Sequence, residues 1–189
     1  MENKLIRQSS ELFKDLETWE SFIELQKILP QITKSWISKF SKELIKINVP
    51  TTWYFQRREN GGVWYLSSES KQEKSLGLWI ENEQFSLWAD QNQYKIETIK
   101  ELINQDEFVA LKEQFKESEI SAGRDAYIFR EKSAFQYESI SLDSNLFAWV
   151  AGNDPQVIVD QLNEKLQIFF TPEITAIFQK INDAARIVQ

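Results

Sequence analysis

Apolar residues recur at three- and four-residue steps between about residues 10 and 48, which is the spacing of one face of an amphipathic α-helix. Pro30 interrupts this pattern, and Pro50 ends it, because the residue before a proline avoids the helical conformation. The block 10–48 is therefore predicted to be a pair of helices. The recurring positions are Leu12, Leu16, Trp19, Phe22, Ile23 and Leu25 or Gln26 in the first helix, and Ile32, Trp36, Phe40, Leu44 and Ile47 in the second.

The block 51–90 alternates between apolar and polar residues, and a period of two predicts half-buried β-strands. Its strongest turn signal is Asn60–Gly61, since a two-residue type I′ turn needs positive φ at both central positions. A turn there places Arg58 opposite Val63 and Phe55 opposite Leu66. One face of the hairpin then receives Trp53, Phe55, Trp64 and Leu66, and the other receives Tyr54, Gln56, Arg58, Val63 and Tyr65.

A second hairpin, with its turn near Asn82–Glu83, completes a four-stranded β-meander. The block 92–118 returns to helical spacing and predicts a second pair of helices. Alternation resumes in the region 124–150, where we expect a further hairpin around Glu131–Lys132 and one more short strand over Leu146–Val150.

The block 154–188 is predicted to be a C-terminal helical pair, because Asp154 and Thr171 each place a capping side chain before a first-turn proline. Strands joined by hairpins form an antiparallel sheet, and helices grouped apart from the strands are typical of the α+β class. We therefore predict an α+β fold in which paired helices at the N-terminus, middle and C-terminus flank the sheet. No linker-like stretch divides the blocks, so residues 1–189 are predicted to form a single domain.

The composition narrows the possible chemistry, because the 189 residues include no Cys and no His. This removes disulfide frameworks, thiolate and imidazole metal sites, and catalytic triads. With only five glycines, the chain also has no glycine-rich phosphate loop. We expect no cofactor and no metal, and the interpretation that fits best is a protein that is not an enzyme.

Glu69–Ser70–Lys71, at the end of a predicted strand, has the acid-x-Lys spacing of some Mg²⁺-dependent nucleases. It lacks a convincing carboxylate on the preceding strand, and such strings arise by chance in a charged chain. Glu69 and Lys71 are therefore kept as a weak alternative catalytic pair, and a solvated linker is the favoured interpretation.

No stretch approaches the roughly 18 uncharged apolar residues that span a bilayer. The first residues also lack an apolar core followed by small residues, so no secretory signal is visible. Together with the absence of Cys, this favours a cytoplasmic protein that does not enter a membrane.

Charge is distributed unevenly along the chain. There are 22 Lys+Arg and 29 Asp+Glu, a net charge of −7, but the segment 27–58 has seven basic residues and one acidic residue. Its net charge is 7 − 1 = +6, so the remainder carries −7 − 6 = −13. The candidate partner-binding residues are Lys34, Lys39, Lys42, Lys46, Arg57, Arg58, Trp53 and Tyr65, because Arg, Trp and Tyr are enriched at interface hot spots.

The leading hypothesis is a non-catalytic protein-binding module, an acidic inhibitor of the immunity or anti-defence type that occupies a basic surface on its partner. The alternative is a nucleic-acid-binding or Mg²⁺-dependent nucleic-acid-processing protein that uses the basic segment 27–58. A third interpretation is a subunit of a larger assembly, and the oligomeric state is left open.

Overall fold

The computed structural model describes residues 13–67, 76–115 and 125–187. The chain divides into two compact units, residues 1–35 and residues 36–189, and each is described by itself. A single domain over residues 1–189 stays a prediction.

The first unit contains the start of α2 (Leu16–Glu43), which ends in the second unit. The Asp15 side chain caps this helix, accepting hydrogen bonds from the Thr18 amide at 2.7 Å and the Thr18 hydroxyl at 2.9 Å. Pro30 lies inside α2, so the predicted division into two helices at Pro30 is wrong. A proline removes one backbone donor, but helix-forming residues on both sides continue the hydrogen-bonding pattern past it.

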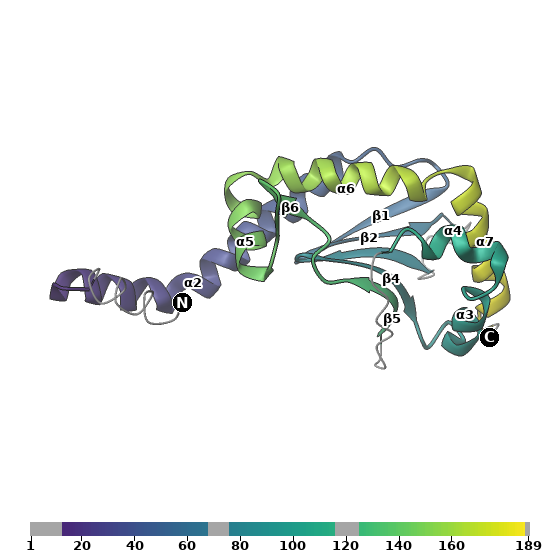
Figure 1. Ribbon diagram of the computed structural model, residues 1–189, viewed down its shortest axis with the longest axis horizontal. Helices are drawn as coiled ribbons and strands as arrows, with labels where there is room; N and C mark the ends of the chain where they lie inside the picture. Colours follow the sequence, from purple (N-terminus) through teal and green to yellow (C-terminus); the bar gives the residue numbers. More distant parts are fainter. Residues whose placement is uncertain (1–12, 68–75, 116–124, 188–189) are drawn as a thin grey trace. The chain divides into compact units, whose positions relative to one another are not determined.

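The second unit is built on a five-stranded antiparallel sheet with the strand order β1-β2-β3-β4-β5 (Figure 1). The strands are β1 (Trp53–Arg58), β2 (Gly61–Leu66), β3 (Gly77–Glu81), β4 (Gln84–Asp90) and β5 (Asp125–Glu131). Helices flank this sheet, which confirms the predicted α+β class.

The register of the first hairpin differs from the prediction by two residues. Arg58 pairs with Gly61 and Phe55 pairs with Trp64, so the turn lies at Glu59–Asn60. Gly61 instead belongs to β2, where an added Cβ would lie 2.1 Å from the Ile80 carbonyl oxygen of β3. The glycine thus permits close approach of two strands. A shift of two residues keeps every side chain on its predicted face.

The two faces of the sheet carry separate hydrophobic clusters. Trp53, Trp64 and Leu66 belong to the main core, as the alternation predicts. The opposite face, which we call the outer face, carries a second cluster of strand residues, namely Val63, Tyr65, Trp79, Trp88 and Tyr127. The predicted assignment of β1 and β2 residues to the two faces is therefore confirmed.

The predicted hairpin around Glu131–Lys132 is wrong, because β5 pairs with β4 and becomes the fifth strand of the main sheet. A separate hairpin is formed by β6 (Gln136–Tyr137) and β7 (Ile140–Ser141). Its turn residues Glu138 and Ser139 both have positive φ, 48° and 67°. Alternation detects strands but does not identify their partners.

The expected strand over Leu146–Val150 is also wrong, since these residues lie in α5 (Ser144–Asn153). Asp143 caps α5 by accepting hydrogen bonds from the amides of Asn145 and Leu146. A short apolar run is ambiguous between helix and strand, and here the cap fixes the helix.

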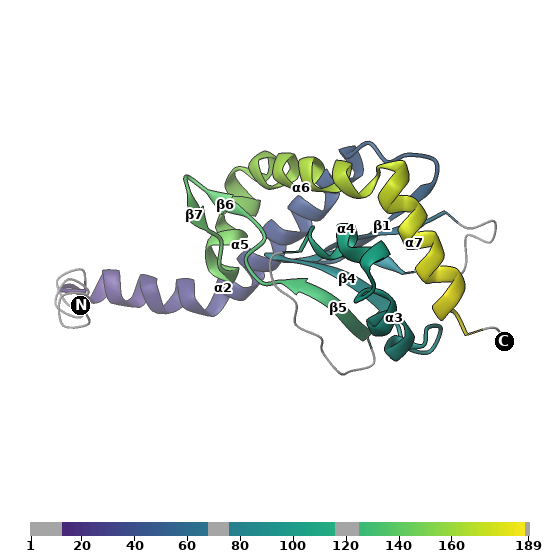
Figure 2. The ribbon, with the colours of Figure 1, turned by 45° about the vertical axis from the view of Figure 1, so that its right-hand side comes forward.

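The remaining helices surround the core side of the sheet (Figures 1 and 2). The predicted middle pair is α3 (Ile96–Leu102), followed by the short turns η2 (Asp106–Phe108) and α4 (Val109–Lys112). The predicted C-terminal pair is confirmed as α6 (Pro155–Phe169) and α7 (Pro172–Ala185). Thr171 caps α7 as expected, whereas Asp154 makes no side-chain capping bond to α6.

Candidate protein-binding surface

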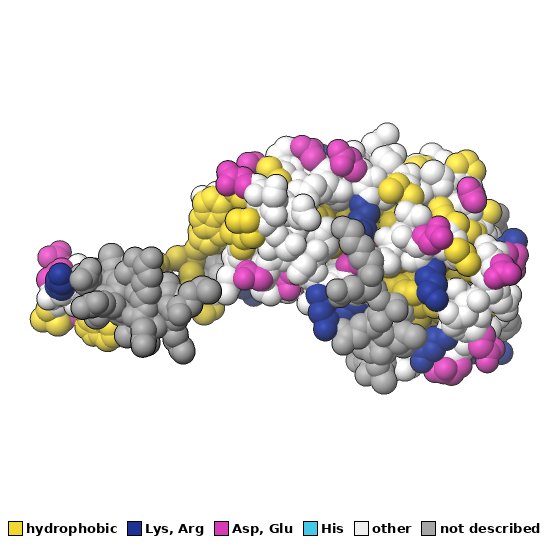
Figure 3. Space-filling view, viewed as in Figure 1, with side chains coloured by type: hydrophobic (Ala, Val, Ile, Leu, Met, Phe, Trp, Pro, Cys, Tyr) yellow, Lys and Arg dark blue, Asp and Glu magenta, His cyan; other side chains and the backbone are white. Residues whose placement is uncertain are grey.

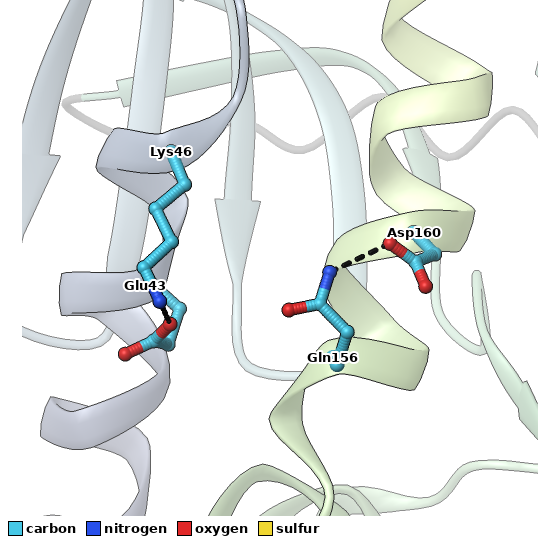
Figure 4. A network of polar contacts seen from close by, with 4 residues as sticks. All are labelled: Glu43, Lys46, Gln156 and Asp160. Carbon is cyan, nitrogen blue, oxygen red and sulfur yellow. Dashed lines mark hydrogen bonds and ion pairs between the residues drawn. The ribbon is translucent and has the colours of Figure 1, made fainter.

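The lysines predicted to bind a partner are largely engaged within the chain. Lys39 donates from Nζ to the Gly152 carbonyl oxygen at 3.1 Å, and Lys46, in η1 (Leu44–Lys46), forms an ion pair with Glu43 (Figure 4). Lys42 is exposed on α2. Lys34 belongs to the first unit and the other lysines to the second.

The two arginines point to opposite faces of β1 because neighbouring strand residues alternate. Arg57 is exposed, whereas Arg58 is half-buried and donates to the Tyr65 hydroxyl at 3.4 Å on the outer face. Trp53 lies in the core, where its indole nitrogen donates to the Thr175 hydroxyl at 3.1 Å. Trp53 and Tyr65 are each only 4 % exposed, so neither offers a ring face to a partner.

Glu69 and Lys71 lie outside the described residues. Within the ranges that the structure describes, no group of three or more Asp or Glu residues is placed to hold a metal ion.

A different surface combines exposed apolar side chains with carboxylates. Ile140 in β7 and Trp149 in α5 are 59 % and 44 % exposed, and the Tyr137 ring of β6 meets the Trp149 ring edge-on at 5.9 Å. Three exposed carboxylates flank these elements: Glu138 in the β6–β7 turn, Asp143 directly before α5 and Asp154 directly after it. We call Tyr137, Ile140, Trp149, Glu138, Asp143 and Asp154 the hairpin–helix surface. Figure 3 shows hydrophobic side chains gathered over α5, with acidic side chains nearby.

The scaffold beneath this surface is fixed by specific contacts. The Gln161 side chain in α6 accepts a hydrogen bond from the Gln136 amide at 2.9 Å and donates to the Gln136 carbonyl at 2.7 Å. These two bonds fasten the hairpin to α6. On α5, Phe147 is buried and its ring packs against Phe40 at 5.3 Å, so Trp149, two residues further on, points outward.

Contacts at the two ends of α5 also hold this helix in place. The Ser144 hydroxyl donates to Glu83 Oε1 at 2.8 Å, which joins the start of α5 to the β3–β4 turn. At the other end, Gly152 packs so closely on Trp36 that an added Cβ would lie 2.3 Å from the indole ring. The exposed Trp149 is therefore presented by a helix that is anchored at both ends.

The electrostatic character of this region is acidic over a long stretch. Residues 133–164 contain five carboxylates, Glu138, Asp143, Asp154, Asp160 and Glu164, and no Lys or Arg. Lys165, the next basic residue, is 18 % exposed and forms an ion pair with the buried Glu131. The Asp143 carboxylate caps α5, and the Asp160 carboxylate accepts a hydrogen bond from Gln156 at 2.7 Å (Figure 4).

The binding residues predicted from the sequence do not include the hairpin–helix surface, because most of them were chosen from the basic segment 27–58. The signal was present, since a stretch of 133–164 without any basic residue stands out in the printed sequence. What periodicity could not supply was that Tyr137 and Trp149, twelve positions apart, lie side by side.

The chain matches no known family model, no curated protein and no solved structure. Among the described residues, no helix has the length and apolar content required to cross a bilayer.

Proposed function

We propose that this chain is a non-catalytic protein-binding module that docks its hairpin–helix surface on a basic surface of a partner protein, as an acidic inhibitor or immunity-type protein does. The observation that carries the proposal is the pairing of exposed Ile140 and Trp149 with carboxylates in a stretch that has no basic residue. The proposal assigns no chemical step to the chain.

The residue types support this proposal. Trp and Tyr are enriched at the centre of protein interfaces, where one buried aromatic ring often carries 2 kcal/mol or more of binding free energy, about 30-fold in Kd. Carboxylates around such a centre attract a basic partner and raise the association rate. Anchoring of the hairpin by Gln161 and of α5 by Ser144 reduces the entropy that binding would otherwise cost.

The test is affinity capture from a lysate of the source cells, followed by a binding measurement with the captured protein. The wild-type chain is compared with Trp149→Ala combined with Ile140→Ser. The matched control is Ile168→Ser on α6, because Ile168 is 45 % exposed and lies outside the hairpin–helix surface. We expect a protein with a basic surface that the wild type and the control retain and the double variant loses, with Kd raised at least about 30-fold by Trp149→Ala alone.

A salt series tests the electrostatic part of the proposal. Glu138→Gln combined with Asp154→Asn is expected to slow association at low salt and to have less effect at high salt. Equal loss of the partner in the Ile168→Ser control, or no protein lost selectively by the double variant, contradicts the proposal.

Nucleic-acid binding is the second candidate, and exposed Lys42 and Arg57 are the residues that favour it. In that case a fluorescent oligonucleotide binds at low salt, and Lys42→Glu with Arg57→Glu abolishes this binding. Oligonucleotide binding that is unchanged by these two substitutions contradicts this second candidate.

A further inference from the structure

The described part of the first unit, residues 13–35, leaves large apolar side chains uncovered. Leu16, Trp19 and Leu25 are 71 %, 46 % and 49 % exposed, and Ile28 and Leu29 are 45 % and 46 % exposed. No residue between 13 and 35 is buried. An isolated helix is marginal in water, and helices in proteins obtain most of their stability by burying an apolar face.

Two shallow grooves mark the surface of this helix, and apolar and charged side chains line them together. One groove is lined by Leu16, Trp19 and Ile23 together with Glu20, Glu24 and Lys27. A second is lined by Leu25 and Ile28 together with Glu17, Glu20, Glu24 and Ser21. Apolar strips with charged margins are the form in which helices pack against other helices.

The distribution of charge along the helix indicates which kind of partner packs against it. Within the helix, the carboxylates Glu17, Glu20 and Glu24 precede residue 25 and the basic residues Lys27 and Lys34 follow it, while Lys14 and Asp15 directly before the helix balance each other in charge. A second copy of the same helix in antiparallel orientation places the acidic part of each helix against the basic part of the other. A parallel copy places like charges together, which is unfavourable.

We propose that residues 16–35 form a homodimerisation element, in which this helix packs antiparallel against the same helix of a second copy of the chain. With the twofold axis between Leu25 and Gln26, Glu17 lies opposite Lys34 of the other copy and Phe22 lies opposite Leu29. This proposal concerns the first unit alone and does not depend on the hairpin–helix surface.

The first test measures the mass of the full chain by sedimentation over a wide range of concentration. We expect a monomer–dimer equilibrium, and Leu25→Glu combined with Leu29→Glu is expected to raise the dimer Kd by about 100-fold or more, because two apolar side chains no longer become buried. The matched control is Ile45→Glu with Ile168→Glu, exposed apolar residues of the second unit that lie outside the hairpin–helix surface. A chain that is monomeric throughout, or a dimer that the control weakens equally, overturns the proposal.

The second test reports the orientation and does not rely on disruptive substitutions. Because the chain contains no Cys, a single introduced thiol can react only with its counterpart. Thr18→Cys and Thr33→Cys are prepared separately and oxidised alone and as a mixture. An antiparallel pair gives disulfide-linked dimers in the mixture and few in either variant alone, whereas self-linked Thr18→Cys overturns the proposal in favour of a parallel pair.

Discussion

Apolar residues at helical spacing occur in both units of the chain, but they are buried in only one of them. In the first unit, no apolar residue of α2 is buried, and Leu16 and Leu25 are 71 % and 49 % exposed. In the second unit, Phe40 of α2 is fully buried, and so is Leu44, the first residue after this helix. The comparison shows that periodicity creates an apolar face, whereas burial depends on whether a complementary surface covers that face.

The second unit supplies such a surface through aromatic and glycine residues. Phe40 meets Phe147 of α5 edge-on, with the ring centroids 5.3 Å apart. Gly62 of β2 leaves room for the Phe55 ring of β1, since an added Cβ there would lie 2.4 Å from that ring and 3.4 Å from the neighbouring Leu44 Cδ1 atom. The described part of the first unit offers only the helix itself.

The largest expected difference between the units comes from removing apolar side chains. We expect Phe40→Ala to lower the free energy of unfolding by about 3–5 kcal/mol, because it opens a cavity beside Phe147. Leu16→Ala is expected to change it by less than about 0.5 kcal/mol. Urea unfolding at low protein concentration measures both, so that a second copy does not contribute. An equal loss of unfolding free energy in the two variants would contradict the expected difference between the units.

The next difference concerns ion pairs. Glu131 and Lys165 in the second unit are 4 % and 18 % exposed, whereas Glu24 and Lys27 in the first unit are 71 % and 62 % exposed. Glu131→Gln leaves the Lys165 ammonium group in a largely buried position, so we expect a loss of about 2–4 kcal/mol. Glu24→Gln is expected to cost at most about 0.5 kcal/mol. Urea unfolding of the two variants at low protein concentration decides this, and a loss below 1 kcal/mol for Glu131→Gln would contradict it.

The smallest difference appears in the response to pH. In the second unit, burial raises the pKa of Tyr94 to about 12, and the nearby carboxylates of Asp183 and Asp90 also raise it. Its hydroxyl donates to Asn182 Oδ1 and accepts from the Leu76 amide at 3.1 Å. In the first unit, the hydrogen bonds from Thr18 lower the pKa of Asp15 instead.

The signs of these effects are opposite. Tyr94 stabilises the fold fully below pH 10, and about 2 kcal/mol is lost as the pH rises from 10 through about 12, because the folded state disfavours the phenolate. Asp15 stabilises the start of α2 above its ordinary pKa, and this contribution is lost as the pH falls through its lowered pKa. Tyr94→Phe is expected to flatten the alkaline loss in urea unfolding at pH 8 to 11. An unchanged slope in this variant would assign the loss to other groups.

The sequence predicted the faces of the sheet better than its pairings. Trp64 and Tyr65 lie on the expected faces because side chains alternate along a strand whatever its partner. The turn at Asn60–Gly61 was misplaced because the close approach of Gly61 to Ile80 depends on β3, which local turn preferences do not include. The fifth strand was assigned to a hairpin for the same reason, since its partner β4 is distant in sequence.

The candidate site was predictable only in part. The basic residues could be named from charge alone, but their partners, such as the Gly152 carbonyl for Lys39, come from distant elements. Trp53 and Trp149 are equally aromatic in the sequence, yet one is 4 % and the other 44 % exposed. Composition identifies the residue types suited to an interface and leaves open which of them reach the surface.

By itself the sequence determined the helices with clear caps, the alternation of the strands, the acidic stretch 133–164 and the absence of Cys and His chemistry. These follow from local backbone preferences and from composition, which need no distant partner. Only the tertiary structure decided that β5 joins β4 and that Tyr137 meets Trp149. Each of these depends on contacts between distant residues, and burial by such contacts supplies the free energy that local preference lacks.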